Sequence, residues 1–206
     1  MKRISALILV SLILSVTLSA LNTHDIHQQI DKRYGALKTW QADLTQTNFF
    51  RQLDRKITYQ GKIYYRPERL LIDFDRPHRQ RLTIAGTRVQ LYDSQTNTVY
   101  KTAILPEFGK MNPVDILRHF WSSSTVSITK QDSKTVSVQL IPQNDPMIKQ
   151  LNARIRRSDW IVEQLSYQDS GGNSVTYDFA NIRINAAIPD GIWEFRLPKD
   201  VQVIEQ

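Results

Sequence analysis

Few side chains in this sequence could do metal or acid–base chemistry. The 206 residues include four histidines and no cysteine. His24, His27 and Asp31 recur at helical spacing, and imidazole and carboxylate groups are ordinary zinc ligands. Such a group at the start of a helix, where helices fray, is more often solvated than ligating. We therefore expect neither a metal site nor a cofactor.

A hydrolase acting on lipid would need a nucleophile and a base. The sequence has no cysteine nucleophile and no Gly-x-Ser-x-Gly turn. His78 lies in a basic turn and His119 in a short apolar helix, so neither has an evident catalytic partner. Asp73 and Asp75 alternate with apolar residues, which predicts that they face outward into solvent. The sequence thus favours a protein that is not an enzyme, with a lipid hydrolase as the less favoured alternative.

The elements that would position any site are mostly short strands. Residues 61–102 alternate between apolar and polar side chains and contain several turn signals, which predicts a meander of four or five strands. One face should be apolar and the other charged. The apolar positions are Ile63, Tyr65, Leu70, Ile72, Phe74, Leu82, Ile84, Val89 and Leu91.

Helical spacing occurs in two places. Residues 25–40 carry one apolar stripe and predict an amphipathic helix. Residues 114–121 predict a short, bulky apolar helix, with Asn112 as its N-cap and Pro113 in its first turn, after a loop at 105–111. Residues 50–55 read as a hairpin tip. Further strands are expected at residues 126–128, 135–141, 148–155, 161–168, 174–184, 192–197 and 201–204.

The first 20 residues have the pattern of a secretory signal peptide. Lys2 and Arg3 precede an apolar run that ends in Ser19-Ala20, and this run is short for a membrane span. We expect residues 21–206 to form a single exported domain without disulfides. The formal net charge of +7 would fall to +5 once Lys2 and Arg3 are removed.

Basic residues cluster at 76–81 and at 154–157. Such clusters can attract an anionic membrane or an acidic partner, or they can be solvated strand edges that prevent edge-to-edge pairing. Both interpretations stay open. Nucleic acid is not an expected partner, because no nucleic-acid-binding motif is present.

These patterns predict a mainly β fold: one strongly curved antiparallel sheet with few helices, in which the 114–121 helix covers the open side. The order and spacing of several motifs resembles the periplasmic outer-membrane lipoprotein carrier family LolA. The motifs are Gln46-Thr47, Gly61-x-Ile63-x-Tyr65-Arg66-Pro67, Leu70 to Phe74, Gly86, Val89-x-Leu91-Tyr92-Asp93, Gln168-Asp169-x-x-Gly172-Asn173, Phe179-x-Asn181, Asn185, Ile188-Pro189-Asp190 and Phe195-x-Leu197-Pro198-x-x-Val201.

The resemblance implies a single incomplete antiparallel β-barrel with a helical lid over an apolar cavity. The cavity would hold the acyl chains of lipoproteins that a monomeric periplasmic chaperone carries from the inner to the outer membrane. The implied partners are outer-membrane lipoproteins, an inner-membrane lipoprotein-releasing ABC transporter and, if present, a LolB-like outer-membrane receptor. A relative that carries another lipid or senses lipoproteins is the alternative.

The resemblance also assigns residues. The cavity is expected to be lined by Ile63, Tyr65, Leu70, Ile72, Phe74, Leu82, Ile84, Val89, Leu91, Ile116, Leu117 and Phe120. Arg66 matches the family arginine that hydrogen-bonds the lid and keeps the empty cavity closed. A guanidinium suits this role because its five donors can hold several backbone carbonyls at once.

Overall fold

The structure, a computed structural model, describes residues 21–104 and 114–205. Their strands form one twelve-stranded sheet in the order β12-β6-β5-β4-β3-β2-β1-β11-β10-β9-β8-β7. The strands are β1 (Trp40–Phe50), β2 (Arg55–Arg66), β3 (Arg69–Arg76), β4 (Gln80–Ala85), β5 (Arg88–Asp93), β6 (Thr98–Ala103), β7 (Ser124–Gln131), β8 (Thr135–Pro142), β9 (Ile148–Arg156), β10 (Ile161–Asp169), β11 (Ser174–Ile184) and β12 (Gln202–Glu205). Neighbouring strands are antiparallel except for β12 and β6, which pair in parallel.

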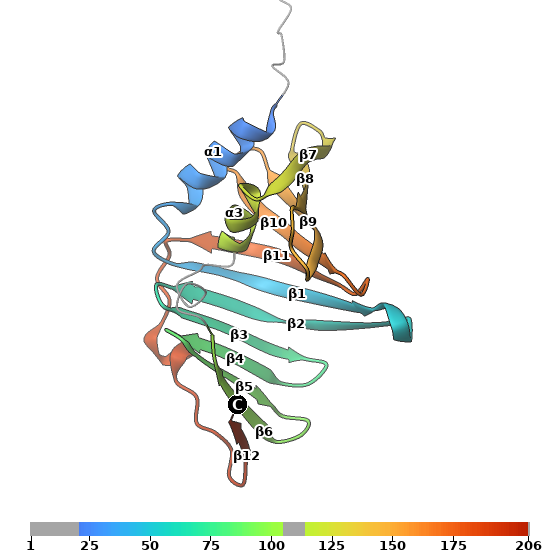
Figure 1. Cartoon of the computed structure of the whole chain (residues 1–206). Helices are drawn as coiled ribbons and strands as arrows, with labels where there is room; N and C mark the ends of the chain where they lie inside the picture. The colour runs from blue at the N-terminus through green and yellow to red at the C-terminus, as the bar shows by residue number, and fades with distance from the viewer. Residues whose placement is uncertain (1–20, 105–113, 206) are drawn as a thin grey trace, which may run out of the picture.

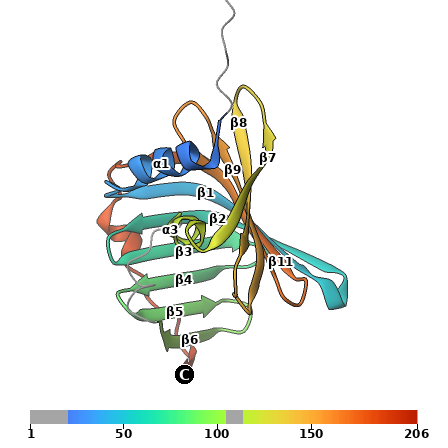
Figure 2. The same ribbon diagram turned by 45° about the horizontal axis from the view of Figure 1, so that its top comes forward.

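The sheet is an incomplete barrel, because β12 and β7 remain as its two edges. Figure 1 shows β1 to β6 stacked one below the other. In Figure 2, β7, β8 and β9 run across the direction of β3 to β6, and α3 is seen in front of β2 and β3, beside β7. The predicted curved antiparallel sheet is therefore confirmed.

The first helix, α1, spans Thr23–Tyr34 and is shorter than the predicted 25–40. Asn22 caps it by accepting a hydrogen bond from the Asp25 backbone N–H at 2.8 Å. The prediction was wrong beyond Tyr34, because Gly35 ends the helix and Trp40 already pairs with Tyr65 and with Ile184 in the sheet. The chain changes direction between Gly35 and Trp40.

The second described helix, α3, spans Asp115–Trp121, with Val114 at the N-cap position. This agrees with the predicted 114–121 helix. The proposed roles of Asn112 and Pro113, the 105–111 loop and the 1–20 signal peptide all lie outside the described residues.

The predicted meander and hairpin tip are both confirmed. The short helix η1 (Arg51–Leu53) joins β1 to β2, and β2 to β6 follow as consecutive antiparallel hairpins. Gly61 sits where two backbones approach closely: a Cβ there would lie 2.1 Å from the Asp73 carbonyl oxygen. Any other residue at this position would force β2 and β3 apart.

The predicted strand at 192–197 is wrong. The chain forms a short helix, η2 (Asp190–Trp193), and then continues without strand structure to β12. We call residues 185–201 the C-terminal strap. Its carbonyl at Ile192 accepts a 2.5 Å hydrogen bond from Arg81 Nη2, and Phe195 packs against Tyr92 with ring centroids 5.3 Å apart. Side-chain contacts of this kind replace the hydrogen bonds of a strand ladder.

The strap explains a second departure from the prediction, which had the outer face of the meander charged. Leu71, Tyr92 and Val99 point outward yet are buried, and Arg81 is only 4% exposed. Asp73 is not simply solvated either, because it accepts a 2.6 Å hydrogen bond from Arg81. The outer face of the meander therefore carries a buried layer of its own.

The main core lies on the inner face of the sheet. It joins α1, α3 and the strands β1, β2, β3 and β8 to β11. Ile26, Ile30 and Tyr34 place the apolar stripe of α1 in this core, and the Tyr34 hydroxyl accepts a 3.0 Å hydrogen bond from the Val162 backbone N–H. Burial raises the pKa of Tyr34 to about 12.

Candidate functional site

Strand register places the predicted apolar residues of the meander on the inner face. One row crosses the strands from Ala42 through Ile63, Ile72, Leu82 and Leu91 to Tyr100. The adjacent row runs from Trp40 through Tyr65, Leu70, Ile84 and Val89 to Thr102. Because side chains alternate along each strand, these rows share one face.

A cavity of about 410 Å³ lies between this wall and the opposite wall of the curled sheet. The meander contributes Ile63, Leu70, Ile72 and Ile84, and β9 to β11 supply Leu151, Leu165, Tyr167, Tyr177 and Phe179. Ile116, His119 and Phe120 of α3 and Asp145 from the β8–β9 loop complete the lining. The interior of the curl is therefore not fully occupied by the side chains of the described residues.

The predicted lining residues divide into two groups. Ile63, Leu70, Ile72, Ile84, Ile116 and Phe120 line the cavity. Tyr65, Phe74 and Leu117 are instead buried in the core, and Leu82, Val89 and Leu91 are half-buried further along the rows. Alternation assigns the face of the sheet, whereas the position of the opposite wall decides which residues border empty space.

The sequence interpretation missed the second wall. Leu151, Leu165, Tyr167, Tyr177 and Phe179 belong to strands whose existence was predicted, but whose inward side chains were not assigned to the cavity. Their alternation along residues 148–155, 161–168 and 174–184 was the available signal. Only the long-range curl of the sheet brings these strands opposite β2 to β4.

The cavity continues toward one end of the sheet. A second hollow of about 480 Å³ shares Ile116, Leu151, Tyr167 and Tyr177 with the first and extends to Met147, Ile148, Asp169 and Ser170. Met147, which is 71% exposed, stands at this end beside the β10–β11 turn, where the Ser170 N–H donates to the Met147 carbonyl at 2.9 Å. We call this end the mouth.

The helix α3 covers the cavity and is joined to α1 by side-chain contacts. Arg118 Nε donates to Asp31 at 2.7 Å, and Arg118 Nη1 donates to Asp115 at 2.8 Å. Burial disfavours the charged guanidinium, but its hydrogen bonds to both carboxylates outweigh burial and raise the pKa of Arg118. The rings of His27 and Trp121 stack with centroids 5.0 Å apart. The sequence patterns predicted neither the Arg118–Asp31 hydrogen bond nor the His27–Trp121 stack.

Arg66 has a partner that the sequence did not suggest. Its Nη1 donates to Asp190 Oδ1 at 2.9 Å, and its guanidinium lies 4.8 Å from the centre of the Trp193 ring. Both contacts are with η2 at the start of the strap. In the described residues, the contacts of Arg66 thus tie β2 to the strap, at the end of the sheet away from the mouth.

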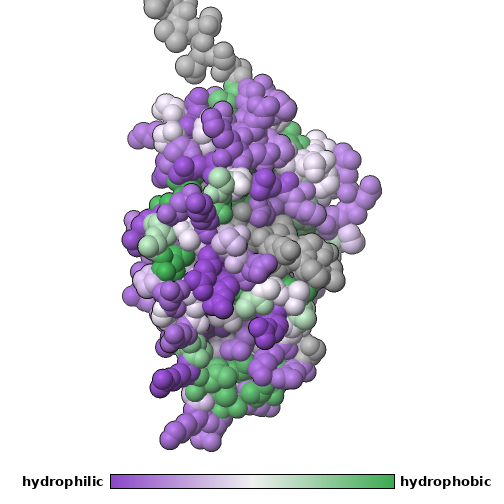
Figure 3. Space-filling model, turned by 90° about the vertical axis from the view of Figure 1, so that its left-hand side faces the viewer, coloured by the Kyte–Doolittle hydropathy of each residue, from purple (hydrophilic) through white to green (hydrophobic). Residues whose placement is uncertain are grey.

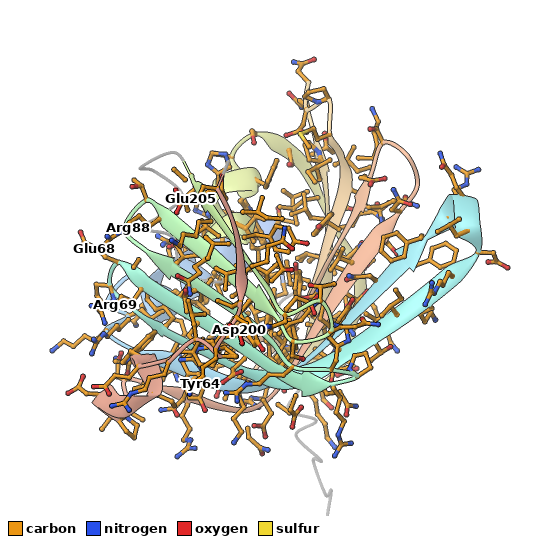
Figure 4. All side chains as sticks on the ribbon, turned by 90° about the horizontal axis from the view of Figure 1, so that it is seen from below. Tyr64, Glu68, Arg69, Arg88, Asp200 and Glu205 are labelled. Carbon is orange, nitrogen blue, oxygen red and sulfur yellow. The ribbon has the colours of Figure 1, made fainter. Side chains whose placement is uncertain are left out.

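That end of the meander is strongly polar. Figure 4 shows Glu68 and Arg69 at the β2–β3 turn and Arg88 close by, on the opposite side of the molecule from the β1–β2 hairpin. Figure 3 shows a mostly hydrophilic surface on the side of the molecule that is at the left of Figure 1, with smaller apolar areas between.

The residues considered for metal or acid–base chemistry have structural partners. His27 lies 3.5 Å from Asp31, which also holds Arg118, and His24 is hydrogen-bonded to Gln28. His78 lies 3.4 Å from Asp93. Within residues 21–104 and 114–205, no cluster of three or more histidine, aspartate or glutamate side chains is arranged to hold a metal ion.

The two basic clusters are largely paired with carboxylates. Arg79 and Arg81 both contact Asp73. Arg156 donates to both carboxylate oxygens of Asp159, at 2.8 and 2.9 Å, and also to Glu163. Much of their charge is therefore neutralised locally, which favours a structural role over attraction of an anionic partner.

The outer face of β1, β2 and β11 carries a separate polar hollow of about 450 Å³. Asp43 lies in it and contacts Lys62 at 3.6 Å and Asn181 at 2.6 Å.

No helix among the described residues is both long and apolar enough to cross a membrane.

Comparisons with known proteins agree with this architecture. The family model for the outer membrane lipoprotein carrier protein LolA matches residues 35–196. An outer-membrane lipoprotein carrier protein of Alcanivorax borkumensis is 24% identical over 138 residues, which span 63% of this chain and 63% of that protein.

Two solved structures share the fold. An uncharacterized conserved protein from Thermus thermophilus superposes with a TM-score of 0.57 and 12% identity, over 89% of this chain and 98% of that one. A chain of the Pseudomonas aeruginosa MucA/MucB complex gives a TM-score of 0.51 and 11% identity, over 84% of this chain and 61% of that one. The curved sheet, its covering helices and the extent of the family match together identify this chain as a member of the outer membrane lipoprotein carrier protein LolA family.

Proposed function

We propose that this protein is a periplasmic carrier that shelters the acyl chains of lipoproteins between the inner and the outer membrane. The observation that carries the proposal is the unfilled apolar cavity beneath α3. Its volume of about 410 Å³ lies within the range of about 300–1,000 Å³ that small-molecule sites occupy. The matching carrier from Alcanivorax borkumensis supports the choice of lipoproteins as cargo.

The energetics explain why a carrier is required. Each methylene group removed from water is worth about 0.8 kcal/mol, so a lipoprotein with several acyl chains cannot leave a membrane unaided. Inside the cavity, the side chains of Ile63, Ile72, Ile84, Leu151 and Leu165 replace the lipid environment. A cavity that is partly open at its mouth also allows the cargo to leave again.

In this proposal, an inner-membrane ABC transporter loads the carrier, and an outer-membrane receptor or the outer membrane itself accepts the cargo. The carrier works as a monomer. In this scheme, filling the cavity moves β2 relative to the strap and breaks the contacts of Arg66 with Asp190 and Trp193, so that loading costs energy and delivery runs downhill.

Hydrolysis is the weaker alternative. The polar groups that line the cavity are His119, Asp145, Tyr167 and Tyr177. Asp145 accepts hydrogen bonds from the backbone N–H groups of Met147 and Ile148, and burial raises the pKa of both tyrosines, which keeps them protonated. Neither arrangement activates a nucleophile.

The test is to incubate purified residues 21–206 with a triacylated lipoprotein and with the same lipoprotein after its acyl chains are removed. We expect a soluble complex with the acylated form alone and no released fatty acid. Release of fatty acid would support the hydrolase, and equal binding of the deacylated form would contradict an acyl-chain carrier. A protein that instead carries another lipid would bind neither form and would copurify with that lipid from periplasm.

A further inference from the structure

Two tyrosines stand on neighbouring strands inside the apolar cavity. In the pairing of β10 with β11, Leu165 lies opposite Tyr177 and Tyr167 lies opposite Val175. Tyr167 and Tyr177 are therefore diagonal neighbours on one face of the sheet, a separation that aromatic side chains can span. Both residues line the cavity as well as the hollow that extends from it to the mouth.

The two side chains lie close enough for each to affect the pKa of the other. Burial raises the pKa of Tyr167 and, more strongly, the pKa of Tyr177, so both groups stay protonated at neutral pH. Each protonated hydroxyl can donate one hydrogen bond. The pair therefore offers hydrogen-bond donors to a ligand in the cavity.

The tyrosine pair marks a boundary in the lining of the cavity. On one side lie aliphatic residues such as Ile63, Ile72 and Ile84. On the other side, the hollow toward the mouth is bordered by Met147, Asp169 and Ser170. An acyl chain has the same division, since its hydrocarbon tail ends in a carbonyl group that only accepts hydrogen bonds.

We propose that Tyr167 and Tyr177 form a subsite for the carbonyl oxygen of an ester-linked or amide-linked acyl chain. The tail then extends toward Ile72 and Ile84, and the group that carries the acyl chain points to the mouth. This inference rests on the proposed carrier function and adds the orientation and the chemical class of the ligand. A carbonyl oxygen accepts a hydrogen bond from a tyrosine hydroxyl without adding a donor of its own.

The charges near the mouth disfavour a free fatty acid. Asp145 lines the cavity, and Asp169 borders the adjoining hollow. Asp169 accepts hydrogen bonds from the backbone and side-chain nitrogens of Asn173 at 2.9 and 2.8 Å, which lowers its pKa and keeps it charged. Two carboxylates would repel a fatty-acid anion, whereas an ester or amide carbonyl has no charge.

The experiment compares dipalmitoylglycerol with its dihexadecyl ether analogue, which has the same tails but no carbonyl. Each lipid displaces the neutral apolar dye N-phenylnaphthylamine from purified residues 21–206. The unaltered protein should bind the ester about five-fold more tightly than the ether, the effect of one hydrogen bond of ordinary strength. The double variant Tyr167→Phe/Tyr177→Phe should reduce this ratio toward one while binding of the ether and the circular dichroism spectrum stay unchanged.

Tyr64→Phe is the matched control. Tyr64 is a half-buried tyrosine on the outer face of β2, where it borders the polar hollow and not the apolar cavity. This variant should keep the full preference for the ester. If neither lipid displaces the dye, the carrier function itself fails and the subsite with it. If both lipids bind equally well, or if the double variant Tyr167→Phe/Tyr177→Phe keeps the preference, the carrier stands and the subsite is overturned.

Discussion

Arg118 of α3 and Asp31 of α1 are joined by a 2.7 Å hydrogen bond between residues 87 positions apart in the sequence. This contact, together with the His27–Trp121 stack, fixes the helix that covers the cavity to the N-terminal helix. Opening of the cavity therefore involves the α1–α3 contact. The contacts of Arg66 lie elsewhere, on the C-terminal strap.

Replacing Arg118 by leucine should make the cavity easier to enter. Exposed and half-exposed ion pairs contribute up to about 1 kcal/mol, so we expect the association rate of N-phenylnaphthylamine to rise roughly two- to five-fold. Stopped-flow fluorescence measures this rate. Arg154→Leu is the control, because Arg154 pairs with Glu163 and Asp178 and not with α1. Equal rates for Arg118→Leu and the unaltered protein would show that α3 does not gate entry.

Replacing Arg66 by leucine should permit loading and impair delivery. Without its contacts to the strap, the empty state is less stable, and the loaded carrier gains less free energy on release. Transfer of a labelled lipoprotein from the carrier to outer-membrane vesicles is the measurement. Asp190→Asn removes only the charge of the partner and should give a smaller defect in the same direction. Normal transfer by Arg66→Leu would remove Arg66 from the mechanism.

Tyr34→Phe should destabilise the fold without affecting the site. The substitution leaves the buried Val162 N–H without its acceptor, which costs about 1–3 kcal/mol of the free energy of unfolding. Urea denaturation followed by circular dichroism measures the loss. Burial raises the pKa of Tyr34 to about 12, although the Val162 hydrogen bond opposes this shift, so the stability of the folded protein should be complete below the unfolded value of 10.0 and should fall as the pH rises through 12. A loss no larger than that of Tyr64→Phe would contradict the assigned hydrogen bond.

Asp159 should contribute stability only above acidic pH. The two hydrogen bonds from Arg156, opposed by partial burial, lower the pKa of Asp159 below its usual 3.8. The contribution is therefore full above about pH 4 and is lost as the pH falls through the lowered pKa. Asp159→Asn should reduce the free energy of unfolding at pH 7 by about 1 kcal/mol or less, since the pair is more than a third exposed, and the difference should shrink near pH 3. Thermal unfolding at pH 7 and near pH 3 measures whether the destabilisation by Asp159→Asn decreases at the lower pH. Asp75→Asn, which changes an exposed carboxylate, is the control.

The sequence was sufficient to predict the strands of the meander and the face that each residue occupies. Period-two alternation is local information, and it places Ile63, Leu70, Ile72 and Ile84 on one face of the sheet, where they border the cavity. The end of α1 was misplaced because Leu37 continues the helical spacing beyond Gly35, although it already belongs to the connection to β1.

Contacts between residues far apart in the chain could not be predicted from local sequence patterns. Asp190 is 124 positions from Arg66, and nothing near either residue indicates the pairing. Likewise, Phe195 reads as part of a strand, yet it packs on Tyr92 of the outer face and lies under the guanidinium groups of Arg79 and Arg81. Tertiary packing overrides local propensity at both places.

The most direct test of the carrier account fills the cavity. Ile84 is half-buried and borders the empty space, so Ile84→Trp should occupy the volume meant for a hydrocarbon tail. Lys62→Trp adds the same indole to the exposed outer face of β2. Isothermal titration with dipalmitoylglycerol should show affinity reduced at least about ten-fold for Ile84→Trp, as expected for the loss of a few buried methylenes, and unchanged for Lys62→Trp. Unchanged affinity of a folded Ile84→Trp protein would mean that the tails bind elsewhere.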